Sequence, residues 1–136
     1  MLDEAVELRG GLVRAFPWTP HYRQRYARAL EARGKVRLAA GLTAEARADW
    51  ETARPVVETL VKDNTGSFID HALLGAVLGD LGRLALDRGD RTEAVRLLDA
   101  ALAEDALALS RDPTITEPAA ARVRHLEDRA RAAPAR

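Results

Sequence analysis

The sequence predicts an all-α fold of repeated helix pairs, and three observations support this prediction. Ala, Leu and Arg dominate the composition and aromatic residues make up only 4%, a balance that favours helices over strands. The sequence matches itself at an offset of 48 residues with no insertion. Turn segments that contain glycine recur at the same offset, at residues 41–45 and 89–93.

The matching positions of this internal repeat are mostly small or apolar. They pair Leu30, Gly34, Gly41, Glu45, Ala46, Trp50 and Ala53 with Leu78, Gly82, Gly89, Glu93, Ala94, Leu98 and Ala101. The same offset aligns residues 2–15 with the second helix of the unit, so the chain is expected to begin with half a repeat. Leu126 takes the place of Leu30 and Leu78 in a last segment rich in Arg and Ala, which we expect to be a capping helix.

The spacing within each copy resembles the tetratricopeptide repeat. Gly34 and Gly82 each follow a Leu by four residues, an Ala stands twelve residues after each Gly, and a large apolar residue stands four further on. In that family the small residues allow two antiparallel helices to cross closely, and the large residue fills the space between hairpins. The period of 48 exceeds the family's 34 residues, and the usual closing Pro is absent.

This resemblance implies a right-handed α-solenoid of antiparallel helix hairpins, in a single domain over residues 1–136. Its expected parts are a half repeat at 1–16, repeats at 20–65 and 67–113, and a capping helix at 117–133. Long-helix variants of the repeat are common in bacterial multidomain proteins. The implied function is therefore a non-catalytic scaffold or adaptor, at the C-terminal end of a larger signalling or regulatory protein.

Six helices are expected in order, near 2–15, 20–40, 43–63, 67–88, 91–110 and 117–132. Gly41 and Gly89 can adopt the left-handed conformation that ends a helix, and Thr43 or Asp90 can cap the helix that follows. Residues 63–67 and 111–114 should link successive hairpins. Pro55 lies inside the third helix, where we expect a kink rather than a break.

Composition and charge narrow the classes of function. The chain contains no cysteine, which excludes thiol nucleophiles and cysteine-based zinc sites. No apolar run approaches the roughly 20 residues that span a bilayer, and the first residues are acidic where a signal peptide would be basic. The formal net charge is zero, which disfavours binding to nucleic acid or to a membrane surface. We therefore expect a cytoplasmic protein.

No convincing catalytic, metal or cofactor site emerges from the sequence. His21, His71 and His125 lack the spacing of a helical metal site, and we expect each on the surface or in a groove. The segment 75–82 contains three glycines, which indicate close helix packing rather than a phosphate loop because no strand precedes them. The carboxylate pairs Asp80 with Asp87 and Glu104 with Asp105 are expected to be solvated. The protein is therefore predicted not to be an enzyme.

A partner-binding surface is expected on the first helix of each pair. In repeats of this kind these helices line a concave groove. The predicted binding residues are Arg28, Glu31, Lys35, Asp80 and Arg83. The cations among them suggest an acidic peptide or one with a C-terminal carboxylate. The alternative is that neighbouring carboxylates, including Asp87, simply neutralise these cations.

A second hypothesis is self-association through residues 2–15, in which another copy completes the solenoid. The charge distribution suits such a contact, because residues 21–62 carry nine basic and five acidic side chains and residues 63–111 carry five and nine. Measuring the molecular mass in solution would separate this hypothesis from binding of a different protein.

Overall fold

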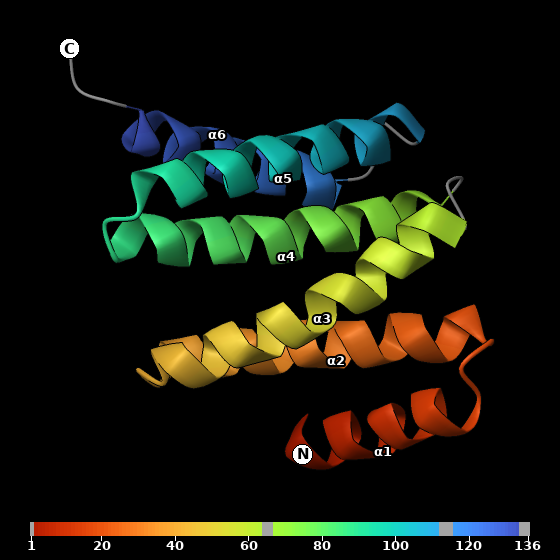
Figure 1. Ribbon diagram of the computed structural model, residues 1–136. Coiled ribbons are helices and arrows are strands. Elements are labelled where there is room, and N and C mark those ends of the chain that lie inside the picture. Colours follow the sequence, from red (N-terminus) through yellow and green to blue (C-terminus); the bar gives the residue numbers. More distant parts are fainter. Residues whose placement is uncertain (1, 64–66, 112–115, 134–136) are drawn as a thin grey trace. The chain divides into compact units, whose positions relative to one another are not determined.

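The computed structural model describes residues 2–63, 67–111 and 116–133, and every regular element among them is a helix (Figure 1). In chain order the helices are α1 (Leu2–Ala15), α2 (Pro20–Ala39), α3 (Thr43–Asp63), α4 (Phe68–Asp87), α5 (Arg91–Arg111) and α6 (Thr116–Ala132). The all-α prediction is confirmed, and each helix lies within one residue of its expected bounds. Most of the two predicted links between hairpins, at residues 64–66 and 112–115, lies outside the described residues.

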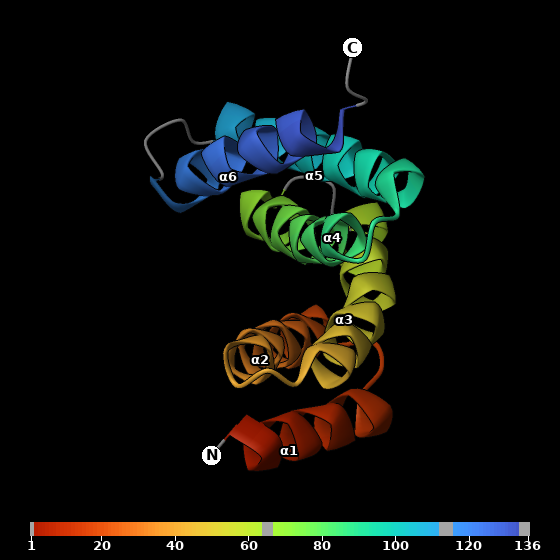
Figure 2. The same cartoon turned by 90° about the vertical axis from the view of Figure 1, so that its left-hand side faces the viewer.

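The chain divides into two compact units, at residues 1–65 and 66–136. In the first unit α2 packs against both α1 and α3, and in the second unit α5 packs against both α4 and α6. Helix α6 also contacts α4, as Figure 2 shows. Both units therefore contain one helix hairpin and one further helix, while the single domain over 1–136 stays a prediction.

In both hairpins a glycine of the first helix lies against a large side chain of the second helix, at matched positions of the repeat. A Cβ atom added to Gly34 would come within 3.0 Å of three atoms of the Trp50 indole. A Cβ added to Gly82 would come within 3.0 Å of two atoms of Leu98. Trp50 and Leu98 are fully buried, and the Trp50 Nε1–H donates to the Glu31 carbonyl at 3.2 Å. The sequence prediction of close helix crossing is confirmed at both glycines.

The turns inside the two hairpins are the same structure. Gly41 has a φ of +82° and Gly89 has a φ of +85°, the left-handed region in which glycine carries no steric penalty. The Leu42 N–H donates to the Arg37 carbonyl at 2.8 Å, and the Asp90 N–H donates to the Ala85 carbonyl at 2.9 Å. This bond across five residues satisfies carbonyls that a helix end leaves without partners.

The helix caps and the continuity of α3 through its proline agree with the sequence predictions, with one exception. The Asp90 carboxylate caps α5 by accepting from the Glu93 N–H at 3.1 Å, as expected. The exception is the cap predicted at Thr43. Thr43 is itself the first residue of α3, and the position before it, which corresponds to Asp90, is occupied by Leu42. Helix α3 continues through Pro55 without a break. Among the described residues no helix is long and apolar enough to cross a membrane.

The α1–α2 and α5–α6 contacts also repeat one another. Asp3 on α1 accepts a hydrogen bond from Arg33 on α2 at 3.2 Å. Asp99 on α5 accepts one from Arg129 on α6 at 2.7 Å. Both residues of the second pair lie 96 positions, or two repeats, after those of the first. The α1–α2 and α5–α6 contacts are therefore two copies of the same helix junction.

We expect Gly34→Ala and Gly82→Ala each to lower the free energy of unfolding by about 1–3 kcal/mol, because the new methyl group overpacks the crossing. The matched control is Gly11→Ala on α1, where the nearest atom outside the local backbone is 4.0 Å from the added Cβ. This change should raise the stability by about 0.5–1 kcal/mol. Urea denaturation followed by circular dichroism measures all three, and equal effects at Gly11 and Gly34 would contradict the close crossing.

Candidate functional site

The predicted binding residues on α2 have different environments. Arg28 is exposed and makes no ion pair with any residue that the structure describes. Glu31 is buried, at 8% exposure, although a groove-facing residue was expected to be open to solvent. The Lys35 ammonium lies 2.9 Å from a Glu31 carboxylate oxygen. One of the predicted binding cations, Lys35, is therefore paired with a carboxylate of its own helix.

The predicted binding residues on α4 lie in the second unit. Asp80 is half-buried. The Arg83 guanidinium lies 3.4 Å from Asp87 on the same helix and 3.4 Å from Asp128 on α6. Two of the three cations thus already have carboxylate partners, one of which is Asp87 as the alternative hypothesis expected. A peptide carboxylate that binds Arg83 would have to share it with these two groups.

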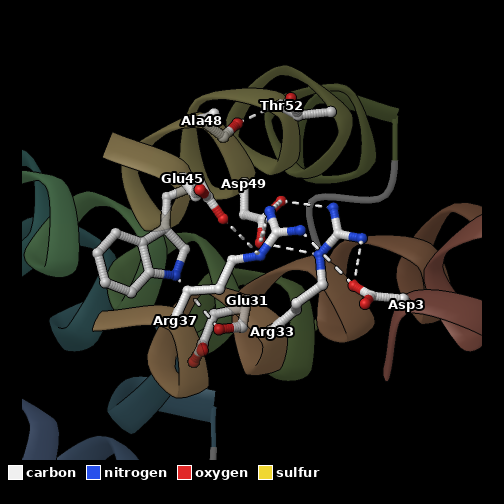
Figure 3. Close-up of polar contacts among 9 residues, drawn as sticks. Asp3, Glu31, Arg33, Arg37, Glu45, Ala48, Asp49 and Thr52 are labelled. Atoms are coloured by element: carbon white, nitrogen blue, oxygen red, sulfur yellow. Dashed lines mark hydrogen bonds and ion pairs between the residues drawn. The ribbon is translucent and has the colours of Figure 1, made fainter. Parts of the chain in front are cut away.

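A buried cluster of charged side chains in the first unit was not predicted from the sequence. Asp49 on α3 is buried, at 3% exposure, and faces two arginines of α2 (Figure 3). Arg33 Nε donates to Asp49 Oδ2 at 3.0 Å and Arg33 Nη2 donates to Oδ1 at 2.7 Å. Arg37 Nη1 donates to both oxygens at 3.1 Å. We call Arg33, Arg37 and Asp49 the arginine cluster.

The arginine cluster extends to two further carboxylates. Asp3 on α1 lies 3.2 Å from Arg33 and 3.6 Å from Arg37, and Glu45 lies 3.9 Å from Arg37. Three helices of the first unit therefore meet at these charges. The hydrogen bond to Asp49 is the main reason that the pKa of Arg33 is raised above its ordinary value, so its guanidinium stays charged.

The second unit replaces the arginine cluster with apolar side chains. One repeat of 48 residues after Arg33, Arg37 and Asp49 stand Leu81, Ala85 and Leu97, all of which are buried. Equivalent places in the two hairpins are thus filled by two chemically opposite sets. Charged residues aligned with Leu and Ala in the other copy were the sequence signal that could have identified the cluster.

The expectation that each histidine lies on the surface or in a groove is wrong for two of the three. His21 is exposed, but His71 and His125 are each 5% exposed. His71 Nδ1 lies 2.6 Å from a Glu104 oxygen, which joins α4 to α5. Each buried imidazole faces a carboxylate from a neighbouring helix, which compensates for the loss of hydration.

The second buried imidazole joins three helices. His125 Nδ1 on α6 lies 2.5 Å from Asp105 Oδ2 on α5, and Asp105 is fully buried. The expectation that Asp105 is solvated is therefore wrong. A Cβ added to Gly79 on α4 would collide with the His125 ring, and one added to Gly75 would collide with Asp105 Oδ1. The glycines of α4 make room for this pair, which confirms that they serve close packing.

A partly exposed group of aromatic side chains lies where no site was predicted from the sequence. Phe16 and Trp18, in the link between α1 and α2, are 50% and 80% exposed. The Phe16 and Tyr22 ring centroids are 5.7 Å apart, and those of His21 and Tyr22 are 6.3 Å apart. We call these four residues the aromatic group. Among the residues that the structure describes, no three His, Asp or Glu side chains are placed to hold a metal ion.

No protein-family model, no curated protein and no solved structure matches this chain.

We expect Asp49→Leu to lower the free energy of unfolding by about 3 kcal/mol, because two guanidinium groups lose the buried carboxylate that neutralises them. The triple change Arg33→Leu, Arg37→Ala and Asp49→Leu copies the second hairpin. It should restore stability to the wild-type value or above it, since a packed apolar set avoids the desolvation of charges. Thermal and urea denaturation test this, and a triple variant less stable than Asp49→Leu would contradict it.

Proposed function

We propose that the chain is a non-catalytic, protein-binding module of the tetratricopeptide type. The observation that carries this proposal is the aromatic group, which lies on the link between α1 and α2 and on the first turn of α2. Trp and Tyr are among the residue types that dominate the energetics of protein–protein interfaces, and Trp18 is only four residues from Tyr22 in the sequence. A Trp that is 80% exposed contributes little to the core, and its burial by a partner would remove a large apolar area from water.

The repeat structure supports the proposal in a second way. The two hairpins share their crossing glycine, their turn and their buried small residues, with Ala46, Ala53, Ala94 and Ala101 fully buried. Helical repeats of this construction present side chains for recognition on a rigid framework. In our proposal the hairpins continue one another in a right-handed solenoid, and the protein acts as a cytoplasmic scaffold or adaptor.

The finer proposal concerns the kind of partner. Of the predicted binding residues, the cations Arg28, Lys35 and Arg83 select an acidic peptide or a C-terminal carboxylate, whereas Glu31 is buried. Arg28 is the most available of these cations, because Lys35 and Arg83 have carboxylates at 2.9 and 3.4 Å. A guanidinium with no carboxylate partner can hold a peptide carboxylate through two parallel hydrogen bonds.

The aromatic group can be tested with peptides selected from a random library on the immobilised chain. Trp18→Ala should weaken binding of a selected peptide about tenfold or more, as expected for a central aromatic anchor. It should change the free energy of unfolding by less than about 0.5 kcal/mol, because the side chain is exposed. Fluorescence anisotropy gives the affinity and urea denaturation the stability. Unchanged affinity for every selected peptide would refute the role of the aromatic group.

The charge preference has its own test in the same selection. Selected peptides should be rich in Asp and Glu, and Arg28→Glu should weaken their binding about tenfold, with a smaller effect at higher salt. Arg47→Glu is the matched control, because Arg47 is an exposed arginine of α3, outside the predicted set. Selected peptides without an excess of acidic residues, or equal losses for Arg28→Glu and Arg47→Glu, would rule out the acidic-peptide proposal.

A further inference from the structure

Helix α6 exposes the face that α2 and α4 use to form a hairpin. Leu126 is 47% exposed, whereas the matching Leu30 and Leu78 are 2% and 4% exposed. Val123 and Ala130 of the same face are also exposed, and their counterparts on α2 and α4 are all buried. These counterparts are Ala27 and Gly34 on α2, and Gly75 and Gly82 on α4. Helix α6 therefore has the sequence pattern of a first hairpin helix, but among the described residues no second helix packs against this face.

Helix α1 shows the complementary deficiency. Leu12 is 40% exposed, whereas the matching Leu60 and Ala108 of α3 and α5 are 2% and 0% exposed. Leu2 and Ala5 are half-buried, at positions where both α3 and α5 are fully buried. The face that a second hairpin helix turns toward its first helix is thus partly uncovered on α1.

The charges at the adjoining ends of the two helices are complementary in the orientation of a hairpin. The last turn of α6 carries Arg129 and Arg131, and the first turn of α1 carries Asp3 and Glu4. In an antiparallel hairpin the end of the first helix lies beside the beginning of the second. The favourable orientation therefore places a basic helix end against an acidic helix start, which also agrees with the two helix dipoles.

We propose that α6 of one copy and α1 of a second copy form a hairpin between chains, in the register of α2 with α3 and of α4 with α5. This inference rests on the proposed protein-binding function and names a second copy of this chain as one partner. Each of the two helices keeps the neighbour that it already has, since α1 packs on α2 and α6 packs on α5 and α4. The contacting faces of α6 and α1 are the ones that those neighbours leave exposed.

The repeat predicts which residues meet. Ala130 takes the place of Gly34 and Gly82, and Leu2 takes the place of Trp50 and Leu98, so Ala130 should face Leu2 of the second copy. Ala130 has one methyl group more than either glycine, which holds the helices slightly further apart and favours reversible association. Because the two faces differ, the contact is heterologous and extends from copy to copy instead of closing as a dimer.

Sedimentation velocity from micromolar to submillimolar concentration tests the association. The wild-type chain should form species larger than a dimer as its concentration rises. Leu126→Glu and Leu12→Glu should each weaken association about tenfold or more, because each places a charge in the apolar contact. Leu107→Glu is the matched control, since Leu107 is an exposed leucine of α5 outside both faces and should leave association unchanged.

Mixing the two variants gives the decisive result. Leu126→Glu keeps an intact α1 face and Leu12→Glu keeps an intact α6 face, so an equimolar mixture should form a heterodimer that cannot grow further. A self-complementary contact, in which α1 pairs with α1 or α6 with α6, would give no such rescue and would overturn the proposal. Circular dichroism of each variant establishes that it is folded, and both changes lie at exposed positions that folding tolerates.

Cysteine crosslinking tests the register, because the chain contains no cysteine of its own. Ala130→Cys mixed with Leu2→Cys should give a heterodimer with a short bis-maleimide, whereas Ala130→Cys mixed with Glu4→Cys should not. The positions that match Glu4 on α3 and α5, Thr52 and Ala100, both face solvent. A monomer at all concentrations together with no Ala130–Leu2 crosslink would overturn the inference. The peptide-binding proposal would be unaffected by that result, since it is measured through Trp18 and Arg28.

Discussion

The close crossing of two helices at a glycine is the constraint on which each hairpin depends. At Gly34 the backbone of α2 comes so near α3 that the Trp50 indole occupies the space of a side chain. The same happens at Gly82 with Leu98. Interiors are packed to crystal-like density, so this spacing determines which residues can lie above and below the crossing. The buried alanines of α3 and α5 follow from it.

Once the helices are this close, the remaining core positions can be filled in chemically different ways. The first hairpin uses Arg33, Arg37 and Asp49, in which two cations surround one buried carboxylate. The second hairpin uses Leu81, Ala85 and Leu97 at the same places. Burial of the charged set costs desolvation free energy. Its hydrogen bonds are directional, and Arg33 also donates one to Asp3 of α1. The apolar set has no such directional demand. The same backbone arrangement thus holds the hydrogen-bonded arginine cluster in one copy and packed apolar side chains in the other.

The junction contact is a second element that occurs in both units. Asp3 with Arg33 and Asp99 with Arg129 are one ion pair in two copies, each joining a second hairpin helix to the first helix of the following pair. Within the described residues, the array therefore shows a hairpin contact and a junction contact in both units. In the part of the chain that the structure describes, α1 and α6 each have the junction contact and no hairpin contact, and apolar side chains on both helices are exposed.

The sequence by itself determined the helices, the turns and the crossing points, because these depend on local patterns. Periodic apolar positions, Gly41 and Gly89 at the helix ends, and the glycine and alanine spacing are all readable along the chain. The burial of ionisable side chains was decided only by the tertiary structure. Whether Asp49, His71 or His125 is buried depends on which neighbouring helix covers it and on the partner that this helix presents. That information lies 16, 33 and 20 residues away in the chain, in Arg33, Glu104 and Asp105 respectively.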